Sequence, residues 1–429
     1  MESTAAPDPL GFEAARDAAR VGLYLHVPFC AVRCAFCHFS SGPVESARVE
    51  RWLAALALEA QWRAPQARGV RFSSVFVGGG TPSILSSRHF RVFWSIVRDH
   101  FEIAPDAEQT LEANPESVRP SLLETWAAAG INRLSMGAQS FDAAELEGLG
   151  RLHGPERPGE AFALARAAGF RRLSLDLMYG FPAHRRETFA RSLDRALALE
   201  PEHLSAYCFI AEEDTPLGRD ALSGRVALPE PELQADLFED FVAASAHRGY
   251  SLYETANACR PGGAARHNLV YWLRRDYLAL GPSAHGLWRG VRYANPYGLE
   301  PWAQALERGE EPAALEPETE DSRTEETLML ALRLSCGLQR RDHEPGAWRR
   351  LEARFGAALA AAVREGRLER QPDGWRIAAP HRFVADDVIA WVAARADAAR
   401  VDSARARSVT SSPCPSLSSP VAPVAATSN

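Results

Sequence analysis

Three cysteines within eight residues are the feature of this sequence that points most clearly to chemistry. Cys30, Cys34 and Cys37 stand in the spacing Cys-x3-Cys-x2-Cys on one short segment. Three thiolates this close can bind three irons of a cubane [4Fe–4S] cluster, which leaves the fourth iron without a protein ligand. An open iron can chelate the amino and carboxylate groups of a small molecule. A zinc site is the alternative, with His26 or His38 as the fourth ligand.

Short β-rich segments alternate with amphipathic helical segments through the first half of the chain. We predict strands at residues 22–28, 74–77, 109–113, 133–136, 173–178 and 204–209, and helices at 49–62, 88–100, 121–129, 159–168 and 186–197. This alternation is typical of βαβ units around a parallel sheet. Six repeats favour an α/β fold built on a partial (β/α)6 barrel, open rather than closed.

Polar or glycine-rich signals follow most of these predicted strands. They are Gly78–Pro82 after the second strand, Glu112 at the end of the third, Gln139 after the fourth, with Arg151 beyond a short helix, and Asp176 inside the fifth. Parallel strands of a barrel end at the same edge, so these residues should meet there. Asp176 lies in an apolar run, where a charge needs a partner or a role.

The remaining chain divides by pattern into further segments. Residues 1–20 are predicted to be a weakly ordered extension, 21–215 the barrel, and 216–296 an α+β extension with a helix at 230–247 and strands at 251–255, 277–281 and 287–293. Residues 297–400 are predicted to form a mostly helical, winged-helix-like domain with helices at 323–335, 348–365 and 385–394 and a hairpin at 368–377. Residues 401–429, rich in Ser, Pro, Val and Ala, read as a disordered tail.

Composition and charge exclude several classes of protein. A net charge of −7 with 46% hydrophobic residues argues against a nucleic-acid binder, and the winged-helix pattern alone does not imply DNA binding. The first twenty residues lack an apolar signal-peptide core, and no apolar run of about 18 residues exists. An odd count of seven cysteines is not a disulfide framework. We therefore expect a cytoplasmic protein without a transmembrane segment.

These motifs together resemble the radical S-adenosylmethionine (SAM) proteins of the oxygen-independent coproporphyrinogen III oxidase family. The resemblance rests on residues 24–39, 78–82, 112–115, 139, 151 and 176–182 and covers roughly residues 21–395. It implies that Cys30, Cys34 and Cys37 ligate a [4Fe–4S] cluster. It also implies SAM contacts from Tyr24, Phe36, Gly80, Thr81, Glu112, Gln139, Arg151, Asp176 and Ile210.

Two branches of this family differ in features that the sequence shows. The oxidase carries another cysteine two residues after the third cluster cysteine, where this chain has Phe39, and it has a longer N-terminal extension. The heme chaperone branch carries a His-Asn-x-x-Tyr-Trp motif, present here as residues 267–272, although it more often has Asp where this chain has His38. The resemblance therefore favours a chaperone that passes heme to apo-hemoproteins such as respiratory enzymes, including membrane-bound acceptors reached by transient contact.

The predicted heme ligand is His267. An imidazole can be an axial ligand of heme iron, and Tyr271 and Trp272 could stack on the macrocycle. The same three residues beside a turn are also typical of ordinary packing. A coproporphyrinogen III dehydrogenase, or a radical enzyme acting on another tetrapyrrole, therefore stays an alternative. The sequence leaves the oligomeric state open, a homodimer included.

Overall fold

The structure, a computed structural model, describes residues 16–17 and 20–410, with side chains described as far as residue 400. Six parallel strands follow one another both in the chain and across the sheet. They are β1 (Gly22–Val27), β4 (Arg71–Gly79), β5 (Glu102–Ala113), β6 (Arg133–Gln139), β7 (Arg172–Tyr179) and β8 (His203–Cys208). The predicted partial (β/α)6 barrel is confirmed.

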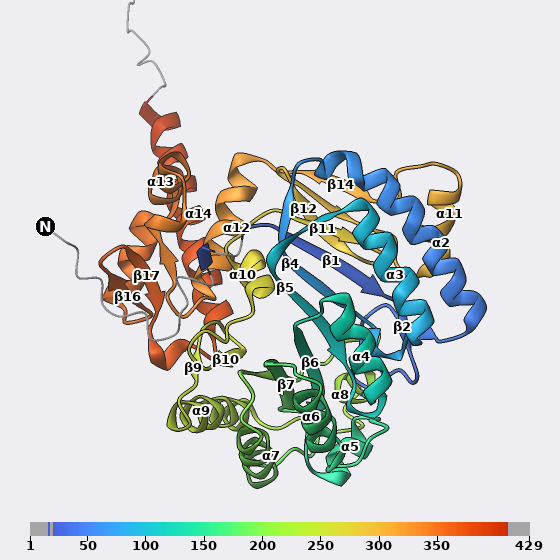
Figure 1. Cartoon of the computed structure of the whole chain (residues 1–429). Coiled ribbons are helices and arrows are strands. Elements are labelled where there is room, and N and C mark those ends of the chain that lie inside the picture. Colours follow the sequence, from blue (N-terminus) through green and yellow to red (C-terminus); the bar gives the residue numbers. More distant parts are fainter. Residues whose placement is uncertain (1–15, 18–19, 411–429) are drawn as a thin grey trace, which may run out of the picture.

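Crossover helices cover the outer face of this curved sheet (Figure 1). They are α2 (Ser46–Arg63), α3 (Ser87–His100), α4 (Pro120–Ala129), α5 (Ala143–Gly148), α6 (Arg157–Ala167) and α7 (Arg186–Ala198). In α3 the Ser86 side chain accepts a hydrogen bond from the His89 amide and caps the helix. Its buried residues Phe90, Phe93, Trp94 and Val97 follow the helical period, so one face packs on the sheet.

The sheet extends beyond the six predicted strands at both edges. β11 (Tyr277–Leu280) returns parallel to β1 and is followed by the antiparallel strands β12 (His285–Trp288), β13 (Val291–Ala294) and β14 (Ala314–Pro317). At the other edge β10 (Asn257–Cys259) and β9 (Ser251–Leu252) run antiparallel next to β8. The described residues thus form one sheet of twelve strands.

Two predicted strands of the extension were wrong in detail. Residues 287–293 form parts of a hairpin rather than one strand, because Arg289 and Gly290 adopt positive φ angles of 51° and 78° and reverse the chain. The strand predicted at 251–255 ends at Leu252. Three helices complete this part of the chain, α8 (Pro216–Leu222), α9 (Pro231–His247) and α10 (Arg266–Trp272). A short pair, β2 (Phe29–Cys30) with β3 (Gly42–Pro43), lies after β1.

A second hydrophobic core begins at Leu328 and supports the C-terminal part, drawn in orange and red in Figure 1. It contains α12 (Glu320–Leu332), β15 (Leu338–Gln339), α13 (Pro345–Arg364), the hairpin β16 (Leu368–Gln371) and β17 (Gly374–Ile377), and α14 (Ala385–Thr410). By contrast, α11 (Leu299–Glu307) contributes Leu299 and Trp302 to the core of the large sheet. The second core therefore begins after β14, within the segment predicted as the C-terminal domain.

The chain ends differ in part from the prediction. α14 continues to Thr410, so the first ten residues of the predicted tail are helical. The rest of that tail, residues 411–429, and most of the predicted N-terminal extension lie outside the described residues. Within the extension, Arg16 forms an ion pair with Asp342 of the C-terminal part at 3.1 Å.

Candidate cofactor cavity at the carboxyl end of the barrel

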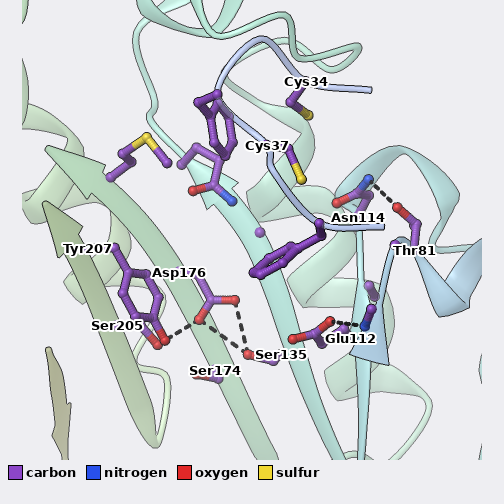
Figure 2. A pocket seen from close by; sticks show the side chains of 18 of the residues that line it. Cys34, Cys37, Thr81, Glu112, Asn114, Ser135, Ser174, Asp176, Ser205 and Tyr207 are labelled. Carbon is purple, nitrogen blue, oxygen red and sulfur yellow. Dashed lines mark hydrogen bonds between the residues drawn. The ribbon is translucent and has the colours of Figure 1, made fainter. Parts of the chain in front are cut away.

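A cavity of about 400 Å³ opens at the carboxyl ends of the parallel strands (Figure 2). Side chains alternate along each strand, so one set packs outward against the helices and the other points into the barrel. Leu175 and Leu177 of β7 are fully buried in the core, whereas Asp176 between them lines the cavity. The inward set includes many polar side chains, which offer hydrogen-bond partners to a ligand, beside apolar ones such as Phe76 and Met178.

The three motif cysteines lie together on the loop after β1, and all three line the cavity. Backbone hydrogen bonds from Ala35 to Leu149 and from Leu217 to Ala35 fix this loop to the ends of α5 and α8. Burial, with a further contribution from the neighbouring thiols Cys34 and Cys30, raises the pKa of Cys37 to about 11. Bound iron would offset this cost by stabilising the thiolates, so the donor set fits a metal cluster.

A continuous arc of hydrogen bonds joins two of these cysteines through the strand ends. The Cys30 Sγ lies 3.3 Å from the Thr81 hydroxyl, which accepts a hydrogen bond from the Asn114 amide at 3.2 Å. Arg151 donates to the Asn114 Oδ1 at 2.9 Å and to the Cys34 Sγ at 3.4 Å. Figure 2 shows Thr81 and Asn114 beside the cysteine loop. The arc therefore orients the thiols from the loops that follow β4, β5 and α5.

The zinc alternative lacks a convergent set of ligands. Within residues 16–17 and 20–400, no three side chains of His, Cys, Asp or Glu are arranged to hold one metal ion. His26 is buried, and its two ring nitrogens lie 3.0 Å from the Tyr24 hydroxyl and 3.0 Å from the Ser40 carbonyl oxygen. His26 is therefore not available as the fourth ligand.

Two carboxylates, Glu112 of β5 and Asp176 of β7, face the cavity from strands on either side of β6 (Figure 2). Asp176 accepts hydrogen bonds from the hydroxyls of Ser135 and Ser205. Glu112 accepts one from the Gly79 amide at 3.2 Å. Burial, followed by repulsion from Asp176, raises the pKa of Glu112 to about 8. This pair would favour a ligand that bears positive charge or hydroxyl donors.

Backbone geometry shapes the rim of the same cavity. A Cβ atom on Gly80 would lie 2.6 Å from the Phe29 carbonyl oxygen, so only glycine lets these segments approach. Gln139 has a φ of 65°, at the point where the register of β6 with β7 shifts. A non-glycine residue in this region of conformational space is strained, and such strain is typical of functional sites.

The floor of the cavity contains a buried cation. Arg133 of β6 donates through Nη1 to the Gly263 carbonyl at 3.0 Å and to Glu108 at 3.4 Å. Its Nη2 and the Thr110 hydroxyl, both buried, have no hydrogen-bond partner among the described residues. Ala265 and Asn268, at the start of α10, line the same floor, so α10 closes the narrow end of the barrel.

The structure brings together nearly all of the residues that the sequence nominates for SAM. Those that line the cavity are Phe36, Gly80, Thr81, Glu112, Gln139, Arg151, Asp176 and Ile210, with the three cysteines. Tyr24 does not line it, because its hydroxyl bonds to His26 and its ring stacks on Phe76.

Several lining residues were not predicted. Asn114, Ser135, Ser174, Ser205 and Tyr207 surround the predicted set. The signal that could have found them is the two-residue period of the strands. Each serine lies two residues from another cavity-lining residue of its own strand: Ser135 from Arg133, Ser174 from Asp176, and Ser205 from both His203 and Tyr207.

His267 lies in a different environment from the one predicted. The ring is fully buried and stacks on Phe76 at 5.3 Å between centroids. Its Nδ1 bonds to the Ser74 hydroxyl at 2.9 Å and its Nε2 to the Tyr271 hydroxyl at 2.8 Å. Burial lowers the pKa of His267 to about 3. With both nitrogens engaged in the core, this geometry speaks against heme ligation by His267 in the described conformation.

A cysteine-lined cavity at the carboxyl edge of a partial barrel is the arrangement of a radical SAM protein. The Radical SAM superfamily matches residues 24–196 of the chain. Coproporphyrinogen III oxidase (HemN) of Escherichia coli has the same fold with a TM-score of 0.75, covering 89% of this chain and 93% of the other at 23% identity.

Curated relatives extend the similarity to nearly the whole chain. The heme chaperone HemW of Mycobacterium tuberculosis is 37% identical over 381 residues, 86% of this chain and 93% of the relative. HemW of Bacillus subtilis is 30% identical over 345 residues, covering 80% and 91%. The chain belongs to the HemW branch of the HemN-like radical SAM proteins.

Membership in the radical SAM family implies a [4Fe–4S] cluster and SAM as cofactors. The cysteine loop, the Glu112–Asp176 pair and the cavity volume fit these groups. No helix among the described residues is long and apolar enough to cross a membrane.

Proposed function

We propose that this protein is a heme chaperone that binds heme and transfers it to apo-hemoproteins such as respiratory enzymes. The observation that carries the proposal is the similarity to curated heme chaperones over most of both chains, at 37% and 30% identity. In the oxidase-like alternative a further cysteine would stand at Phe39. Here that side chain is apolar and 55% exposed at the cavity mouth.

In this proposal the barrel cavity holds SAM next to the cluster. Cys30, Cys34 and Cys37 would hold three irons, and the open iron would bind the methionine end of SAM, which a reduced cluster can cleave to a 5′-deoxyadenosyl radical. Glu112 and Asp176 would accept hydrogen bonds from the nucleoside and offset the positive sulfonium. The arc from Thr81 to Arg151 would hold the thiols in place.

Heme would then bind outside the barrel cavity, which this proposal assigns to SAM. The barrel floor is hydrophilic, and the His267 motif lies in the core beneath it. Phe76, Ser74 and Tyr271 enclose the imidazole, so heme could not reach it without opening the barrel. A surface site would also suit transfer, because the acceptor must reach the bound heme.

The test uses anaerobically reconstituted protein titrated with heme and then mixed with an apo-hemoprotein. The proposal predicts a Soret band that saturates near one heme per chain and moves to the acceptor's spectrum on mixing. A protein that binds no heme, or that converts coproporphyrinogen III to a vinyl-bearing product with SAM and a reductant, would contradict it.

A further inference from the structure

Two neighbouring polar side chains at the floor of the barrel cavity are left incomplete. Thr110 of β5 and Arg133 of β6 are partners in the register of adjacent strands, and both line the cavity while being only 1% and 2% exposed. The Thr110 hydroxyl and the Arg133 Nη2 have no hydrogen-bond partner among the described residues. Buried polar groups in folded proteins are nearly always hydrogen-bonded, so two adjacent groups without partners mark a place that a bound molecule completes.

The charges at the floor favour a molecule that is negative. The Glu108 Oε2 lies 3.4 Å from the Arg133 Nη1 and 3.9 Å from the Nη1 of the partly exposed Arg172, and the other oxygen of Glu108 accepts from the His267 amide. Two guanidinium groups thus share one buried carboxylate. A guanidinium only donates hydrogen bonds, and the Thr110 hydroxyl can also donate, so both groups can be satisfied by one ligand with two acceptor oxygens.

The neighbouring polar side chains are engaged with one another. The His203 ring lies between the Ser174 hydroxyl, 2.6 Å from its Nδ1, and the Tyr253 hydroxyl, 2.9 Å from its Nε2. The Asn268 amide also donates to the Tyr253 hydroxyl. Asp176 accepts hydrogen bonds from serines, and burial raises its pKa, which reduces the negative charge that it brings to the cavity.

The pair lies deeper in the barrel than the residues assigned to SAM. Thr110 precedes Glu112 by two residues on β5, and Arg133 precedes Ser135 by two on β6. A strand rises about 3.3 Å per residue, so the pair lies about 7 Å further from the cysteine edge than Glu112 and Ser135. Phe76, the register partner of Thr110 on β4, gives this level of the cavity an apolar wall.

We infer that the barrel floor binds the carboxylate group of a small organic acid, at a site beneath that of SAM. One carboxylate oxygen would accept from the Arg133 Nη2 and the other from the Thr110 hydroxyl, and the apolar body of the acid would lie against Phe76. A monovalent carboxylate suits the site better than a phosphate dianion, because Asp176 and Glu112 line the cavity above it. The inference adds a ligand to the chain and does not depend on heme transfer.

The experiment titrates the reconstituted full chain with butyrate, in a buffer without other carboxylates, and follows binding by calorimetry and ligand-observed NMR. Wild type should bind butyrate at one saturable site and should not bind butyramide, which has the same shape without the charge. Thr110→Val should weaken butyrate binding about fivefold, through the loss of one hydrogen bond to a charged group. Arg133→Lys keeps the charge but loses the fork of donors and should weaken it about tenfold or more.

Stability separates a binding role from a structural one. Thr110→Val removes a hydroxyl that has no partner in the described chain, so the variant without ligand should melt at or above the temperature of wild type. Arg63→Lys is the matched control for Arg133→Lys, because Arg63 is also 2% exposed and paired with glutamates but does not line the cavity. Thr125→Val is the control for Thr110→Val, since the Thr125 hydroxyl bonds within the helix layer to Ser87 and Ser121. Both controls should bind butyrate as wild type does.

Three results would overturn the inference. They are a wild type without saturable butyrate binding, equal binding of butyramide, and folded Thr110→Val and Arg133→Lys variants that bind butyrate as tightly as wild type. Each would mean that water alone completes the floor. Heme binding and transfer by wild type are measured separately, so failure of this site leaves the chaperone proposal standing, and failure of heme transfer leaves the carboxylate site standing.

Discussion

At the scale of single residues, the buried carboxyl groups of Glu112 and Asp176 favour a cationic ligand, because burial destabilises their charged forms when no ligand is bound. Glu112 would be mostly protonated at neutral pH without a ligand, since burial and Asp176 raise its pKa to about 8. The pKa of Asp176 is itself raised by burial, and the hydroxyls of Ser205 and Ser135 partly offset that rise. A cationic ligand between the two would favour their ionised forms, which links SAM binding to proton release.

The Glu112→Gln variant, studied without SAM, tests how much the buried carboxylate of Glu112 lowers the free energy of unfolding. Because the pKa of Glu112 is about 8 when folded and near 4.5 when unfolded, the folded chain binds more protons between those values. The stabilising contribution of wild-type Glu112 is thus present below pH 4.5 and is lost as pH rises toward 8. The variant should become more stable than wild type as pH rises across this window, by on the order of 4 kcal/mol at pH 8. Thermal unfolding against pH measures it, and a pH-independent difference would contradict the assignment.

Gly80 offers a second residue-scale prediction. Gly80→Ala would press a methyl group against the Phe29 backbone, next to Cys30. We expect a lower melting temperature, a loss on the order of 1–3 kcal/mol, and lower cluster occupancy after reconstitution. Gly154→Ala is the control, since a methyl group added there would meet nothing within 4 Å and the φ of Gly154 is ordinary. Equal iron content and equal melting temperatures in the two variants would rule out the steric role.

At the scale of elements, α10 joins the barrel floor to the rest of the molecule. His267 bonds through its backbone amide to Glu108 of β5 and through its ring to Ser74 of β4. Leu269, Val270 and Leu273 of the same segment pack with Tyr253 and Leu334 in a separate small core. In the described conformation, the His-Asn-x-x-Tyr-Trp motif therefore packs against the barrel floor and connects it to the small core.

His267→Leu tests whether the motif stabilises the fold or binds heme. The change leaves the Ser74 and Tyr271 hydroxyls buried without their partner, so we expect a loss of about 2–4 kcal/mol of stability. The Soret band of bound heme should keep its position in the protein that remains folded. A stable variant with a shifted Soret band would instead support His267 as the heme ligand that the sequence predicts.

At the scale of the whole molecule, an ion-pair cluster holds the C-terminal part against the sheet. Arg274, just after α10, pairs with Glu326 of α12 at 2.6 Å and with Glu318 before that helix. Arg292 of β13 reaches the same Glu326. These side chains are mostly buried, so removing one partner leaves charge unpaired.

Arg274→Met should loosen the connection between the two cores. Among the described residues, Glu318 would keep Arg323 as an ion-pair partner and Glu326 would keep Arg292, and we expect a loss on the order of 2 kcal/mol. Cleavage by a protease between β14 and α12 should accelerate, with the large sheet remaining intact. An unchanged melting temperature and cleavage rate would show that packing alone joins the two parts.

The sequence predicts the barrel well because its signals are local. Each buried strand shows as an apolar run and each crossover helix as a 3.6-residue period, and polar residues that follow parallel strands must meet at one edge. The return of β11 to pair with β1 is not local, since Tyr277 lies beside Gly22 across more than half of the chain. The sequence also did not show that the His267 side chain points into the core, because a motif gives the residue types but not the direction in which each side chain points.

The measurement that tests the central claim most directly is the EPR spectrum of the reduced, reconstituted protein with and without SAM. The geometry places three cysteines and the Glu112–Asp176 pair around one cavity, so SAM should change the cluster signal in wild type. Cys37→Ser should lose both the intact cluster and SAM binding. A wild-type cluster whose spectrum does not change at saturating SAM, or a Cys37→Ser variant that binds SAM normally, would contradict the account.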